Sequence, residues 1–193
     1  MAGSIDLASE VQLVGSHLLE RLAQPGEPSL ETVTACRRLF LAVGETALVR
    51  WLDCEINGYE RSGAVSLREL LGVPDDSPLA ARVRSYRQYV GRVRTLVPTA
   101  SGRPLQVPYF FGESLQTLRH CRANADALGT DVIEVELIPT AADPALVPSG
   151  APVRTLEFPR YIFYRILSGL AVELEIAVRD ILQRATNPGS DDA

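Results

Sequence analysis

The sequence predicts an α+β fold with a helical N-terminal half, a small and mostly antiparallel sheet, and a long C-terminal helix. Apolar residues recur at helical spacing within residues 5–57, whereas residues 131–138 alternate between apolar and polar side chains as in a strand. A second helical stripe fills residues 159–185. Because the elements are grouped along the chain and do not alternate regularly, the order favours α+β over a doubly wound fold.

Three helices are predicted in the N-terminal part. The first covers residues 5–24 and ends in the helix-breaking run AQPGEPS. Ser29 is a suitable N-cap for the second, over residues 30–43, because its hydroxyl can accept a hydrogen bond from a free backbone N–H of the first turn. The third covers residues 45–57, and the glycine that follows is a common helix terminator.

The middle of the chain predicts shorter elements. One short helix is expected within RSGAVSLRELLGVPDDSP, and the Val- and Tyr-rich residues 83–96 are predicted as a strand. The Gly/Pro-rich residues 99–108 are expected to be a connection. Residues 113–128 are predicted as a helix, followed by the strand at 131–138 with one apolar face.

The C-terminal third predicts a loop, a short strand and the long helix. Residues 140–152 form a Pro/Ala-rich loop, and VRTLEF is a candidate strand. Pro159 stands where a helix-opening proline belongs, so the long helix is expected from there to residue 185. We expect residues 1–186 to form a single domain and residues 187–193 to be a flexible tail.

Composition favours an ordinary globular protein. Hydrophobic residues make up 46% and charged residues 22% of the chain, and the net charge of −5 gives no support for general affinity to nucleic acid. All 19 basic residues are arginine. Each cation is therefore planar, permanently charged and able to bind a carboxylate or phosphate through two hydrogen bonds.

The expected compartment is the cytoplasm. The three cysteines lie far apart without CxxC spacing, which suits a reducing environment better than a disulfide framework. The N-terminus lacks the cationic and apolar regions of a signal peptide, and no run approaches the length of a membrane span. We therefore expect no membrane partner.

The sequence holds no recognisable catalytic or metal-binding motif. Its only histidines are His17 and His120, and His120 and Cys121 point about 100° apart on a helix, so they cannot easily share a metal or form a nucleophilic pair. The chain has no phosphate-binding loop and no GxSxG elbow. We expect no metal and no cofactor. A catalytic dyad assembled from distant residues stays open.

An arginine-rich segment, ARVRSYRQYVGRVR, is a candidate anion or nucleic-acid site. In a continuous strand, side chains two apart share a face, so five of its residues would form one basic and aromatic surface. These are Arg82, Arg84, Arg92, Arg94 and Tyr86. Such a surface can hold phosphates and stack bases. The favoured alternative is a solvated outer face whose arginines pair with carboxylates.

Glu55 is the unusual residue of the run WLDCEINGYE. On a helical wheel it falls between Trp51 and Leu48, within a broad apolar arc that also holds Tyr59. A buried carboxylate has to be paired, hydrogen-bonded or protonated. We expect it to be a structural anchor bound to an arginine of a neighbouring element, and the alternative is a functional acid in a pocket. The candidate partners are Arg37, Arg38 and Arg87.

The last helix is apolar on two faces. Besides its main stripe, Ile162, Val172 and Ile176 gather on the other side, around Gly169. A helix of this kind is either central in its domain or contacts a partner. If it contacts a partner, these three isoleucine and valine side chains are the expected interface.

The run Trp51, Leu52, Glu55, Asn57, Gly58 and Tyr59 resembles the most recognisable part of the AbiTii domain, a module of prokaryotic abortive-infection (antiphage) proteins. The helical N-terminal region, the segment SYRQYVG and the aliphatic C-terminal helix resemble the same family. The resemblance implies a bacterial antiphage setting and does not imply a particular reaction.

The leading functional hypothesis is a non-enzymatic module of an antiphage system that binds another protein or itself, and so regulates or recruits an effector. One alternative is a toxin-like hydrolase or nuclease acting on RNA through Glu55 and the arginines of the predicted strand. Another is a nucleic-acid or nucleotide sensor that uses Arg82, Arg84, Arg92 and Arg94 without chemistry.

Overall fold

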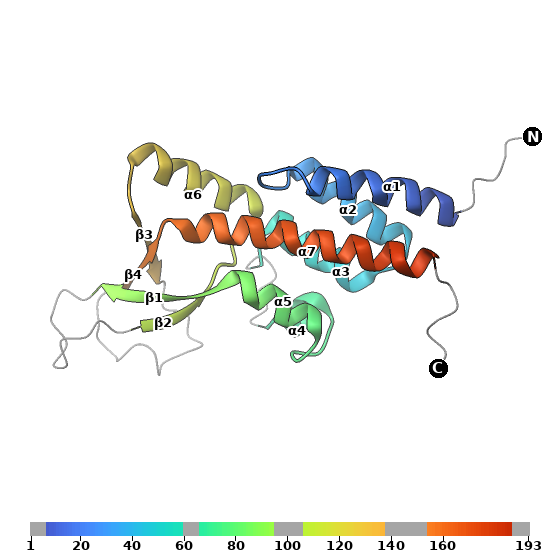
Figure 1. Ribbon diagram of the computed structural model, residues 1–193. Coiled ribbons are helices and arrows are strands. Elements are labelled where there is room, and N and C mark those ends of the chain that lie inside the picture. Colours follow the sequence, from blue (N-terminus) through green and yellow to red (C-terminus); the bar gives the residue numbers. More distant parts are fainter. Residues whose placement is uncertain (1–6, 60–65, 95–105, 138–153, 187–193) are drawn as a thin grey trace, which may run out of the picture.

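The computed structural model describes residues 7–59, 66–94, 106–137 and 154–186. Within these ranges it has seven helices and one four-stranded antiparallel sheet, and it ends in a long helix (Figure 1). The α+β fold class is therefore confirmed. None of the helices in the described ranges has the length and apolarity to cross a membrane.

The three N-terminal helices lie close to their predicted positions. They are α1 (Leu7–Leu22), α2 (Leu30–Ala42) and α3 (Thr46–Asn57). Ser29 caps α2 as expected, since its hydroxyl accepts a hydrogen bond from the backbone N–H of Thr32 at 3.0 Å. The short helix α4 (Leu67–Leu71) follows.

The predicted strand at 83–96 is only partly correct. Residues up to Arg87 belong to a helix, α5 (Pro78–Arg87), and the strand β1 (Gln88–Arg94) begins only after it. The physical reason is the cap: Ser77 accepts a hydrogen bond from the N–H of Ala80 at 3.2 Å, and Pro78 fits the first helical turn. Residues 95–96 lie outside the described ranges.

The sheet has the strand order β2-β1-β4-β3, with β2 (Gln106–Phe110) and β3 (Val132–Leu137) at its edges and β4 (Arg154–Pro159) beside β1. Sequence analysis assigned part of β2 to a connection. Pro108 is tolerated there because β2 is an edge strand, which does not need every backbone N–H for pairing.

The remaining helices are α6 (Leu115–Leu128) and α7 (Tyr161–Thr186). The prediction that Pro159 opens α7 is wrong. Pro159 is the last residue of β4 and lies opposite Val132 of the neighbouring strand β3. The predicted loop at 140–152 and the predicted tail at 187–193 lie outside the described ranges.

α7 is the central element of the core. It runs along the molecule with α1 and α6 on one side and α5 on the other (Figure 1). A methyl group added at Gly169 would lie 2.5 Å from the Cβ of Tyr86, so glycine lets α5 pack directly against α7. α5, which sequence analysis did not predict, therefore packs against the second apolar face at Gly169.

The three residues of the predicted partner interface on α7 therefore differ in exposure to solvent. Ile162 is buried in the core, so its assignment to an exposed interface is wrong. Val172 is 53% exposed and Ile176 is 36% exposed. The partner hypothesis for α7 keeps only these two side chains.

Candidate functional site

Glu55 lies at the centre of a buried polar cluster. Its side chain is completely buried, as predicted, and is ion-paired with Arg87, one of the three arginines named from the sequence. One carboxylate oxygen accepts this bond. The other accepts hydrogen bonds from the hydroxyls of Tyr59 and Tyr86 and from the indole N–H of Trp51.

Arg87 joins this cluster to the segment between β2 and α6. Its guanidinium also donates to the backbone carbonyls of Phe111 at 2.7 Å and Glu113 at 2.9 Å, and it lies over the Tyr59 ring. Burial works against its charge, but Glu55 and the two tyrosines raise the pKa of Arg87 above its usual range. The arginine is therefore charged in the folded protein.

Burial, followed by the negative charge of Glu55, raises the pKa of Tyr59 and of Tyr86 well above the usual value. Both hydroxyls therefore stay protonated and act as donors. Because Glu55 and Arg87 are fully buried, a substrate has no access to the carboxylate. The arrangement fits a structural anchor that joins α3 and α5 to the segment between β2 and α6.

The predicted basic and aromatic surface does not exist as one face. Arg82 and Arg84 are on α5, whereas Arg92 and Arg94 are on β1, because the helix ends between them. Tyr86 is buried in the Glu55 cluster and is not free to stack on a base, which corrects its assignment to a binding surface.

Carboxylates accompany these four arginines. Arg82 pairs with Glu173, Arg84 with Asp75, and Arg94 with Glu134 and Glu157. Arg92 is exposed and lies opposite Glu157 in the strand register. Of the favoured alternative the structure shows the pairing with carboxylates and not a single face, and the pairing leaves little unpaired positive charge for a phosphate backbone.

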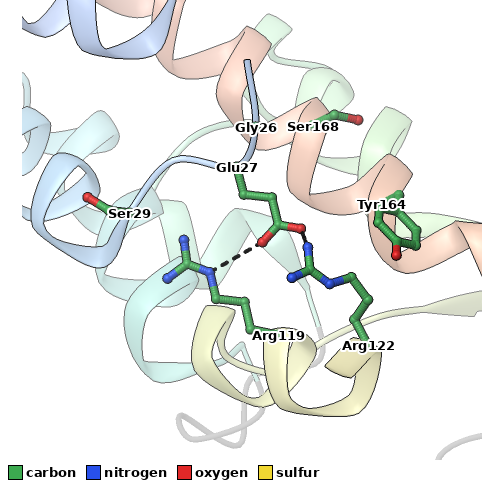
Figure 2. A pocket seen from close by; sticks show the side chains of 7 residues that line it. All are labelled: Gly26, Glu27, Ser29, Arg119, Arg122, Tyr164 and Ser168. Atoms are coloured by element: carbon green, nitrogen blue, oxygen red, sulfur yellow. Dashed lines mark ion pairs between the residues drawn. The ribbon is translucent and has the colours of Figure 1, made fainter. Parts of the chain in front are cut away.

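Two arginines lie in an open groove of about 780 Å³, shown in Figure 2. Its walls come from the α1–α2 loop, α6 and α7. The lining residues are Gly26, Glu27, Ser29, Arg119, Arg122, Tyr164 and Ser168. We call this the Glu27 groove.

Two arginines of α6 hold the carboxylate of Glu27 in this groove. Arg119 and Arg122 are three residues apart, so both side chains leave the same side of the helix. The Arg119 Nε lies 3.7 Å from one Glu27 oxygen, and Arg122 pairs with the other (Figure 2). Arg119 also donates to the backbone carbonyl of Pro28.

Tyr164 adds an aromatic ring to the groove. Tyr164 donates a hydrogen bond to Asp126 at 2.7 Å, which raises the pKa of the phenol, and Arg122 lies over the Tyr164 ring at 5.2 Å. The N-terminal end of α2, with its partial positive charge, begins beside the groove at Ser29. Burial lowers the pKa of Arg119, so an added anion would find a partly desolvated cation there.

The two serine hydroxyls that line the groove are already hydrogen-bonded. The Ser29 hydroxyl caps α2, and the Ser168 hydroxyl donates to the backbone carbonyl of Arg165. Neither hydroxyl is hydrogen-bonded to a histidine or carboxylate that would activate it as a nucleophile. Within the described ranges, no cluster of His, Cys, Asp and Glu side chains has a metal-binding arrangement.

Sequence analysis missed this groove. Glu27 belongs to AQPGEPS, which was identified only as a helix breaker, and Arg119 and Arg122 lie in a predicted helix that drew attention only for His120 and Cys121. The one available signal was the spacing of the two arginines on a helix. Their partner, Glu27, is far away in the sequence. It precedes Pro28, which is itself 91 residues before Arg119.

Comparison of the chain with protein-family models, with curated proteins and with solved structures gives no match. The resemblance to the AbiTii domain therefore stays a prediction based on the residues from Trp51 to Tyr59.

Proposed function

We propose that the chain is a non-enzymatic protein-interaction or regulatory module of a bacterial antiphage system, and that it binds an acidic segment of its partner in the Glu27 groove. The observation that carries the proposal is the convergence of two arginines on one carboxylate in an open groove. The resemblance at Trp51–Tyr59 supports the antiphage setting and a cytoplasmic location.

The ligand chemistry follows from the occupant. Arginine forks match carboxylates, and charge-assisted hydrogen bonds of this kind are roughly twice as strong as neutral ones. A partner's glutamate or aspartate presents the same group as Glu27. Because the groove is open, such a side chain can approach the two arginines from solvent.

Glu27 is then an internal competitor. A partner's carboxylate has to displace it, so the intact groove is expected to bind an isolated acid weakly and to need further contacts from the partner. A module that binds only a suitable acidic segment gains selectivity from this competition. Such contacts would come from the other residues that line the groove, which include Tyr164 and Ser168.

A direct binding experiment tests this function. A fluorescein-labelled oligoglutamate peptide should bind the protein by fluorescence anisotropy, and the oligoglutamine counterpart should not. Glu27→Gln should tighten binding about tenfold, since a charge-assisted bond no longer has to be replaced. Arg119→Gln combined with Arg122→Gln should reduce binding to background.

Arg179→Gln is the matched control, because Arg179 is an exposed arginine of α7 paired with Glu175, outside the groove. The affinity of this variant for the oligoglutamate peptide should equal that of the wild type. Equal binding of the glutamine peptide would contradict the proposal. Binding of inorganic phosphate without any binding of the peptide would identify a small-anion site and would also contradict the proposal.

The setting needs a separate experiment. In the native bacterium, replacing the gene by the Arg119→Gln/Arg122→Gln variant should raise the efficiency of phage plating toward that of a gene deletion. The Arg179→Gln gene should protect as the wild type does. Full protection by the double variant would show that defence does not depend on this groove.

A further inference from the structure

A second hollow lies between α6 and the edge strand β3. Its volume is about 460 Å³, and its walls are mostly apolar. Its α6 wall includes Leu118, Cys121, Ala125 and Leu128, whose spacing of three, four and three residues places them on one side of the helix. We call this hollow the β3-edge groove.

The groove follows the edge of the strand. Four consecutive residues of β3 line it, from Val132 to Val135. Successive side chains of a strand point to opposite faces, so a hollow that touches all four has to run along the strand edge. The strand order puts β3 at the end of the sheet, and in the part of the chain that the structure describes no strand pairs with its outer side.

Large apolar side chains are exposed at this edge. Leu128 is 76% exposed and Val132 is 48% exposed, and both line the groove. Natural edge strands usually carry charges, prolines or a covering element that prevents pairing with another chain. β3 carries such a charge at Glu134, but the apolar groove beside it gives this edge the form of a strand-addition site.

We propose that the β3-edge groove binds an extended segment of a partner protein, which adds to β3 as a further strand. Backbone hydrogen bonds to β3 would hold the segment, and its alternate apolar side chains would fill the groove beside α6. The proposal is independent of the Glu27 groove.

The lining charge defines the chemistry of the segment. The groove is lined by two carboxylates and no arginine: Glu113 accepts a hydrogen bond from Tyr109 at 3.3 Å, and Glu134 pairs with Arg94. The expected partner segment therefore alternates apolar residues with basic ones. Lysine or arginine would reach the carboxylates while valine or leucine entered the groove.

Cys121 gives a direct readout of occupancy. It lines the groove and is partly exposed, whereas Cys36 and Cys54 are buried. Burial raises the pKa of all three thiols, that of Cys36 to about 12 and that of Cys54 to about 11. An alkylating reagent near neutral pH should therefore label Cys121 first, and a bound segment should slow that labelling.

The test uses a short peptide of alternating lysine and valine. Binding should slow iodoacetamide labelling of Cys121, and Leu128→Asp should weaken binding about tenfold or more, since the apolar contact of one leucine is lost. Leu13→Asp is the matched control, because Leu13 is an exposed leucine of α1 with 62% exposure. Circular dichroism should show that both variants keep their fold.

A second peptide tests the strand pairing. The same sequence with its backbone N–H groups methylated at alternate residues cannot donate to β3 and should not protect Cys121. Equal protection by the methylated peptide would overturn strand addition. The assignment would also be overturned if neither peptide protected Cys121. Concentration-dependent dimerisation that Leu128→Asp abolishes would overturn it too, and would show that a second copy of this chain occupies the groove.

Discussion

The Glu55 cluster and the Glu27 groove use the same chemistry in opposite surroundings. Each places arginine beside a glutamate, but Glu55 and Arg87 are completely buried, whereas the Glu27, Arg119 and Arg122 side chains are roughly one-fifth to one-quarter exposed. Removing a partner inside the core leaves a charge that water cannot reach. At the groove, water or another anion can take the place of the lost partner. Burial therefore separates an anchor from an exchangeable contact.

The largest expected effect tests the anchor. Glu55→Ala should lower the free energy of unfolding by about 3–5 kcal/mol, because Arg87 is left buried and unpaired. Glu55→Gln should cost less, since it keeps the shape and some hydrogen bonds. Thermal melting of the wild type and both variants measures this. An alanine variant that melts with the wild type would show that the buried pair does not stabilise the fold.

The second effect concerns the packing that holds the cluster in place. Gly169→Ala would put a methyl group 2.5 Å from the Tyr86 Cβ. Alanine favours a helix over glycine by about 0.5–1 kcal/mol, but overpacking costs about 1–3 kcal/mol, so we expect net destabilisation. Urea unfolding measures it, with Gln183→Ala on the exposed side of α7 as the control. A stabilised Gly169→Ala variant would mean that α5 can move away from α7 without loss.

Glu55 and the boundary between α5 and β1 show what the sequence could and could not predict. The burial of Glu55 followed from helical periodicity and the cost of a lone carboxylate, which are local properties of residues 48–59. The α5–β1 boundary was misplaced because Val83 and Tyr86 are typical of strands, yet the Ser77 cap starts a helix and tertiary packing keeps it. A cap signal was present in the sequence, at Ser77 and Pro78, and outweighs composition here.

The Glu27 groove was harder to predict because it depends on tertiary structure. Glu27 and Arg122 have no relationship in sequence spacing, and only the packing of α1, α6 and α7 brings the loop to the helix. The strand β2 shows the same limit, since Pro108 argues against a strand unless one knows that the strand is at an edge. Edge positions and long-range pairs are properties of the assembled sheet.

The third effect is a dependence of stability on alkaline pH that should come from the buried cluster. The folded-state pKa values of Tyr59 and Tyr86 are raised above the usual 10, so the folded protein holds protons that the unfolded chain releases. This contribution to stability is present below about pH 10 and is lost as the pH rises above it.

Cys36 and Cys54 act in the same direction from about pH 9, because burial raises both of their pKa values. Urea unfolding at roughly pH 8 and roughly pH 10.5 should show a lower free energy of unfolding at the higher pH. Tyr86→Phe should be less stable at pH 8 by about 1–3 kcal/mol, since Trp51 and Glu55 lose a buried partner, but its decline with pH should be shallower. An equally steep decline would show that Tyr86 does not titrate differently in the two states.

The smallest expected effect completes the comparison with the groove. Glu27→Gln should change the free energy of unfolding by less than about 1 kcal/mol, because partly exposed ion pairs contribute little and the two arginines keep access to water. The same substitution at Glu55 should cost clearly more, although the chemical change is identical. Melting curves of the two glutamine variants, recorded in parallel at low and high salt, measure the difference. Added salt should narrow any small gap between Glu27→Gln and the wild type, since salt screens exposed charges, and it should leave the Glu55→Gln gap nearly unchanged. A Glu27→Gln variant as unstable as Glu55→Gln would make Glu27 a second structural anchor and would remove the basis for treating its groove as open to a partner's carboxylate.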